Sequence, residues 1–234
     1  MAVAATPLPT GLGTLAQPVV MAGERLLPVL PPLEPLFPAG GLRRGSVVSV
    51  TGSTSLALAA LAAASAQGSW CAAVGMPSLG LAAAAELGLA LERFPLVPSP
   101  ARSSGPGGWA WVVAALLDAF DVVLARPPAS VKAADARRLT ARVRERGAAL
   151  VVAGGGWPEP PEVQLTVAAA SWDGVGRGHG RLRGRRVEVV GGGRGAAARE
   201  RRVALWLPHP EGGVRSEARE VVDERRPHAR RVVS

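Results

Sequence analysis

A short loop rich in hydroxyl groups has the residue types from which a phosphate site is built. It follows an apolar run at 47–50 and precedes an alanine-rich segment at 56–66. In nucleotide-binding proteins such a turn holds phosphate through backbone N–H groups, a second glycine and a lysine that neutralises charge. Here the second glycine is missing and Leu56 stands about where the lysine is needed. The loop residues are Gly52, Ser53, Thr54 and Ser55.

The carboxylates that nucleotide hydrolysis requires are also missing from the expected positions. A metal-binding aspartate belongs at the carboxyl end of a later strand. The apolar run 122–125 is instead followed by Arg126, and the nearest aspartate, Asp121, precedes the run. The strand at 70–74 is followed by Gly75 and Met76 rather than by an acidic base. We therefore expect no catalytic residue and no cofactor. Weak phosphate contact at a helix N-terminus stays open.

A second candidate site is an arginine- and glycine-rich segment late in the chain. Guanidinium groups spaced along a hairpin pair with phosphates or carboxylates of a partner. The alternative is a charged sheet edge that prevents aggregation. The net charge of +9 favours an acidic partner without deciding between these interpretations. The candidate residues are Arg177, Arg181, Arg183, Arg185 and Arg186.

Other reactive residues are too scattered to form a site. The three histidines lie far apart and Cys71 is the only cysteine, so no metal-ligand spacing and no internal disulfide is possible. A lone cysteine, a first basic residue only at Arg25 and no clean run of about 20 apolar residues predict a cytoplasmic protein without a membrane span.

The elements that position these residues follow from the apolar pattern. Short apolar runs alternate with helical segments up to residue 153, which predicts an α/β fold with a mostly parallel sheet flanked by helices. The segments 163–170, 181–190 and 201–207 read as strands with no helix between them, which predicts a C-terminal antiparallel meander. The expected helices are 56–66, 79–87, 109–120 and 133–146.

Composition divides the chain into three parts. Residues 1–40 are rich in proline and carry few charges, so we expect an extended N-terminal arm whose leucines pack on the domain. Residues 41–208 contain the alternating pattern and form the domain. Residues 209–234 are polar, carry both basic and acidic side chains and lack apolar periodicity, which predicts a flexible tail.

Three segments together resemble the core of RecA-type ATPases. They are 40–52 (GGLRRGSVVSVTG), 85–93 (AELGLALER) and 116–124 (LLDAFDVVL). The resemblance covers roughly residues 36–208 and implies a RecA-like core that has become a pseudo-ATPase. The eroded phosphate loop, the arginine-rich hairpin and the ending Trp206-Leu207-Pro208 are similar to actinobacterial ImuA-type proteins.

This resemblance implies a role beside other proteins rather than catalysis. ImuA-type proteins are accessory proteins of damage-induced mutagenic translesion synthesis in the SOS response. They scaffold an inactive Y-family polymerase homologue of the ImuB type and an error-prone replicative-type DNA polymerase, and DNA is a further expected partner. Two alternatives remain open: an SOS cell-division inhibitor of RecA-like descent, and a RecA-like DNA-binding ATPase.

Overall fold

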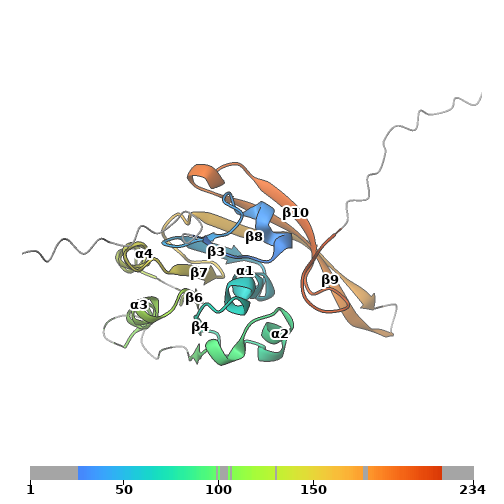
Figure 1. Cartoon of the computed structure of the whole chain (residues 1–234), viewed down its shortest axis with the longest axis horizontal. Helices are drawn as coiled ribbons and strands as arrows, with labels where there is room; N and C mark the ends of the chain where they lie inside the picture. Colours follow the sequence, from blue (N-terminus) through green and yellow to red (C-terminus); the bar gives the residue numbers. More distant parts are fainter. Residues whose placement is uncertain are drawn as a thin grey trace, which may run out of the picture.

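A nine-stranded sheet forms the centre of the chain (Figure 1), whose computed structural model describes residues 26–98, 100, 105, 107–129, 131–175 and 179–217. The strand order is β11-β10-β9-β8-β3-β7-β6-β4-β5, and the six strands from β8 to β5 run parallel. The parallel strands are β3 (Val47–Thr51), β4 (Cys71–Val74), β5 (Leu96–Val97), β6 (Val122–Ala125), β7 (Ala149–Ala153) and β8 (Val163–Val175).

Helices cover both faces of the parallel part, as the continuous apolar runs of its strands require. Alternate residues of one strand point to opposite faces, so Val48 and Val50 of β3 join one apolar core and Val47 joins the other. The first core contains α1 (Thr54–Ala66) and α2 (Leu81–Glu86). The second contains α3 (Trp109–Ala119) and α4 (Ala133–Arg146). The predicted α/β class and the mostly parallel sheet are confirmed.

The last third of the sheet is the predicted antiparallel meander. Strand β8 pairs with β9 (Gly180–Gly193), β9 with β10 (Arg201–Trp206), and β10 with β11 (Arg215–Ser216). Both hairpin strands are longer than the sequence pattern predicted, because pairing continues through exposed residues without apolar alternation. The β8–β9 hairpin extends well beyond the helices that cover the rest of the sheet (Figure 1).

The described part of the proline-rich N-terminal segment packs on this meander. Strand β1 (Leu26–Leu27) pairs with β2 (Leu42–Arg43), and a short 3-10 helix, η2 (Pro31–Leu36), lies between them in sequence. Leu33 and Leu36 of η2 are buried. Leu36 lies directly over Gly191 of β9, where a side chain would meet it at 3.1 Å. Residues 1–25 of the predicted arm lie outside the described residues.

The ordered sheet continues past the boundary that we predicted at residue 208. His209 donates its backbone N–H to the carbonyl of Gly213 (2.9 Å), which closes a turn. The chain then returns as β11 along the edge of β10. The first residues of the predicted tail are thus a strand edge, and residues 218–234 lie outside the described part.

No helix among the residues that the structure describes is long and apolar enough to span a membrane.

Candidate functional site: the loop after β3 and its arginines

The loop after β3 begins with a turn that requires glycine. Gly52 has φ +83°, and a side chain there would approach the Cβ atom of Val167 to 3.2 Å. Ser53 then caps α1: its hydroxyl accepts a hydrogen bond from the backbone N–H of Leu56 at 3.2 Å. Ser53 is therefore the N-cap, and α1 begins at Thr54.

Two arginines from distant parts of the chain converge on the hydroxyls of this loop. Arg126, directly after β6, donates to the hydroxyl of Thr54 at 2.9 Å. Arg185 of β9 donates to the hydroxyl of Ser53 at 3.4 Å. The carboxyl end of β6, where a metal-binding carboxylate would be needed, therefore holds a cation in contact with the loop. The positive charge of Arg126 would repel a Mg²⁺ ion at this position.

Leu56, at the position of the missing lysine, is completely buried and belongs to the core between α1 and the sheet. Its side chain therefore points away from the space in which a phosphate would lie. The neighbouring hollow has a volume of about 210 Å³ and is lined by Thr54, Ser55, Met76 and Arg126 among others. Pockets that hold small molecules measure about 300–1,000 Å³. The hollow beside the loop is smaller than this range, and the loop lacks the lysine.

The aspartates near the parallel strands form structural ion pairs. Asp121 lies at the opposite end of β6 from the loop, pairs with Arg44 at 2.9 Å and accepts a hydrogen bond from the backbone N–H of Trp70. Asp118, at the end of α3, binds Arg142 and Arg146 of α4. The hydrogen bond from Arg142 lowers the pKa of Asp118. In the described residues no cluster of histidine, cysteine and carboxylate side chains could hold a metal.

The predicted hairpin arginines divide between the two faces of β8–β9. Arg185 pairs across the strands with Trp172, and its guanidinium lies 5.8 Å from the centre of that indole ring. Arg186 lies on the other face, 4.5 Å from the ring of Trp206, with ion pairs to Asp173 and Glu217. These intramolecular contacts hold both guanidiniums in place.

The outer hairpin arginines present a different environment. Arg181 and Arg183 are exposed, and neither makes a side-chain hydrogen bond or ion pair within the described part of the chain. Exposed apolar side chains lie on the same part of the hairpin: Trp172 is 49% exposed and Leu182 is 55% exposed. Arg177 lies outside the described residues. The outer hairpin is therefore the part of the predicted basic segment that is available to a partner.

The single thiol is not available for chemistry. Cys71 begins β4 and is completely buried. Burial raises the pKa of its thiol to about 12. A neutral thiol in an apolar core is neither a nucleophile nor a metal ligand at neutral pH.

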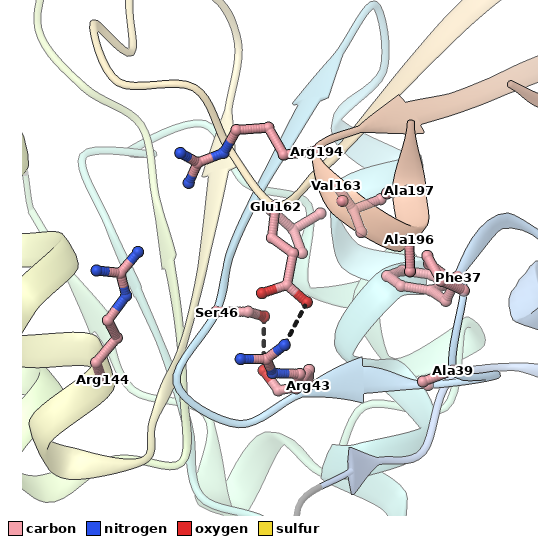
Figure 2. A pocket seen from close by; sticks show the side chains of 14 residues that line it. Phe37, Ala39, Arg43, Ser46, Arg144, Glu162, Val163, Arg194, Ala196 and Ala197 are labelled. Carbon is pink, nitrogen blue, oxygen red and sulfur yellow. Dashed lines mark hydrogen bonds and ion pairs between the residues drawn. The ribbon is translucent and has the colours of Figure 1, made fainter. Parts of the chain in front are cut away.

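A pocket at the opposite end of β3 was not predicted from the sequence (Figure 2). It is lined by Arg43, Arg144 and Arg194, together with Glu162. These residues belong to four separate segments, and neither hydrophobic periodicity nor motif spacing indicates that they meet. Only the order of the strands brings them together.

Comparison with known proteins gives two matches. Residues 35–159, more than half of the chain, match the family described as the MT3502 N-terminal domain. The uncharacterized protein Rv3395c of Mycobacterium tuberculosis is 35% identical over 169 residues, which is 68% of this chain and 80% of the relative. The family match includes the loop after β3 and the arginine that follows β6, whereas the β8–β9 hairpin lies beyond it.

Proposed function

We propose that this chain, which belongs to the MT3502 N-terminal domain family, is a non-catalytic accessory protein of damage-induced mutagenic DNA synthesis. Its domain is a RecA-like pseudo-ATPase of the ImuA type. It scaffolds an inactive Y-family polymerase homologue of the ImuB type and an error-prone replicative-type DNA polymerase, in the cytoplasm.

The order of the elements supports the RecA-like assignment. Parallel strands come first, the loop with the eroded motif follows the central strand β3, and an antiparallel meander completes the sheet. The notable relative is a mycobacterial protein, which agrees with the actinobacterial group that the sequence resembles. Fold alone does not determine function, which depends on the residues of the loop and of the surfaces.

The observation that carries the proposal is the contact of Arg126 and Arg185 with the hydroxyls of Ser53 and Thr54. In an ATPase these positions serve phosphate and a metal ion. Here the polar groups form intramolecular hydrogen bonds that fix the turn, and the lysine position is part of the core. The loop therefore has a structural role, and function depends on surfaces that bind other molecules.

The outer hairpin is the surface that we assign to DNA within this role. Arg181 and Arg183 are exposed, and the indole of Trp172 offers a ring for base stacking. We expect affinity for single-stranded oligonucleotides to fall steeply with salt and to be reduced by Arg181→Ala with Arg183→Ala. Binding that is unaffected by these changes would exclude the hairpin.

A titration with a fluorescent ATP analogue (mant-ATP) and Mg²⁺ tests the pseudo-ATPase assignment. We expect no saturable binding in the micromolar range and no phosphate release. Saturable micromolar binding would overturn the assignment. Loss of that binding in a Thr54→Ala variant would place the nucleotide at this loop.

A further inference from the structure

The pocket at the start of β3 is separate from the degenerate loop, which lies at the other end of that strand. Its volume is about 470 Å³, within the range of about 300–1,000 Å³ that holds small ligands. In Figure 2, the guanidiniums of Arg144 and Arg194 stand on one side of the pocket, with Phe37 and Ala197 on the other. The ion pair of Arg43 with Glu162 lies between them.

Backbone contacts fix the positions from which these arginines project. Gly45, two residues after Arg43, lies so close to α4 that a Cβ atom there would be 3.5 Å from the Cα atom of Arg144, and its N–H donates to the carbonyl of Ala148 at 2.7 Å. This holds the turn before β3 against the end of α4.

The third arginine is fixed in the same way on the other wall. The backbone N–H of Arg194 donates to the carbonyl of Glu162 at 3.1 Å. The preceding Gly193 approaches that carbonyl so closely that a Cβ atom there would lie 2.0 Å from it. Arg194 is thus held beside Glu162 by backbone geometry that permits no side chain at position 193.

The charges of the pocket are unbalanced. Three guanidiniums line it, and Glu162 is the one carboxylate among its lining residues. That carboxylate contacts Arg43 at 3.6 Å, a single long ion pair. Arg144 and Arg194 are exposed and make no side-chain hydrogen bond or ion pair within the residues that the structure describes. The pocket therefore attracts negative charge at two unpaired guanidiniums.

The floor of the pocket is apolar. Phe37, Val48, Val163 and Ala197 are almost completely buried and belong to the first core. The wall formed by Ala39, Gly41, Gly195 and Ala196 consists of small residues, which leaves space above the floor. An apolar side chain of a ligand could therefore lie on the floor while its anionic groups remain at the rim.

We propose that this pocket binds an acidic peptide segment of a protein partner. Carboxylates of the segment pair with Arg144 and Arg194, each through charge-assisted hydrogen bonds, and a neighbouring apolar side chain occupies the floor. This peptide site is a separate proposal from the role in mutagenic DNA synthesis, and its test measures peptide binding to the isolated chain. It holds or fails whichever partner protein supplies the segment.

The composition of the pocket favours a peptide over nucleic acid. Phosphate groups along a nucleic acid backbone would leave the buried apolar floor without a contact. A peptide that alternates acidic and apolar side chains satisfies both parts of the pocket. An oligonucleotide is therefore the competitor in the test.

The test selects phage-displayed random short peptides on the full chain and measures the affinity of the enriched peptides by fluorescence anisotropy. We expect the enriched sequences to carry acidic residues beside an apolar one. Arg144→Ala with Arg194→Ala should weaken binding roughly tenfold or more, since each lost bond is charge-assisted. The matched control is Arg137→Ala with Arg138→Ala, which removes the same charge from exposed positions of α4 outside this pocket.

A second variant tests the pocket without removing an arginine. Glu162→Gln frees Arg43 from its ion pair and removes the competing carboxylate, so acidic peptides should bind more tightly. Enriched peptides that lack acidic residues, or weakening that is equal in the control, would overturn the proposal. Displacement of the peptides by single-stranded oligodeoxythymidine would do the same and would identify a nucleic acid site. Peptide binding without recovery of a polymerase homologue from cells would sustain the pocket while contradicting the proposed function.

Discussion

Introducing a lysine at the phosphate-loop position by Leu56→Lys should unfold the domain rather than create an ATPase. Leu56 lies in the first turn of α1, and its side chain is completely buried in the core that α1 shares with the sheet. A lysine at this position must place its amino group in that core. Among the residues that the structure describes no carboxylate is buried, so the new charge would lack a partner.

The expected loss follows from the ionisation of a buried amine. Documented buried lysines titrate at about pH 5–6 instead of about 10.4, so at pH 7 burial costs about 4.6 kcal/mol, which is the free energy of deprotonating an ordinary lysine at that pH. Truncation by Leu56→Ala removes only packing and should cost about 3–4 kcal/mol. Domains are typically stable by about 5–15 kcal/mol, so the lysine variant should be largely unfolded or close to it.

Urea unfolding followed by circular dichroism measures this series, with Leu56→Met as the volume-matched control that should change stability by less than about 1.5 kcal/mol. Phosphate release is measured on every variant that folds, and none is expected. A Leu56→Lys variant as stable as the parent chain, with Mg²⁺-dependent ATP binding, would contradict this prediction. It would show that residue 56 faces a usable phosphate site.

Three further predictions concern other parts of the fold. Asp118→Asn should cost about 1 kcal/mol at neutral pH, because exposed ion pairs contribute about 0.2–1 kcal/mol each and Asp118 binds Arg142 and Arg146. Because the pKa of Asp118 is lowered in the folded state, its contribution to stability is present above the usual aspartate range and is lost as pH falls through the folded pKa. A difference in urea midpoint between the parent chain and Asp118→Asn that persists in strong acid would contradict this. Cys71 should react with Ellman's reagent at pH 8 only after unfolding, and rapid labelling of the native chain would show that the thiol is accessible. Gly193→Ala should destabilise by about 2–4 kcal/mol, because the new Cβ atom meets a backbone carbonyl at 2.0 Å; an unchanged urea midpoint would mean that this turn relaxes freely.

The sequence predicts the parallel part of this fold well because its strands are continuous apolar runs. Such runs at 47–50 and 122–125 become β3 and β6, and the stripe of Ala136, Leu139 and Val143 becomes the buried face of α4. The ends of the meander are predicted less well. Trp172 and Val175 are exposed on β8, so the strand continues through residues whose burial follows no alternation.

The candidate site is predictable only in its local part. The absence of the lysine can be seen at Leu56, four residues after Gly52. The absence of the metal-binding carboxylate can be seen at Arg126, directly after the apolar run 122–125. The contact of Arg185 with Ser53 joins residues 132 positions apart, and it depends on how far β9 extends beside β8. The pocket of Arg43, Arg144 and Arg194 depends in the same way on strand order, which the sequence pattern leaves undetermined.

Position 208 illustrates a boundary that composition places too early. Polar residues after 208 suggested a tail, yet β11 at Arg215–Ser216 pairs with β10. Backbone hydrogen bonds stabilise this edge strand without an apolar face, so no hydrophobic pattern marks it. A truncation that removes the tail without disturbing the sheet should therefore end after Glu217.

Co-purification from DNA-damaged cells of the organism that encodes the chain tests the proposed role in mutagenic DNA synthesis. The tagged full chain is compared with a version that ends at Glu217, with undamaged cells as the reference. We expect recovery of an inactive Y-family polymerase homologue and an error-prone DNA polymerase with the full chain. Recovery of cell-division proteins, or of no DNA-synthesis protein, would contradict it.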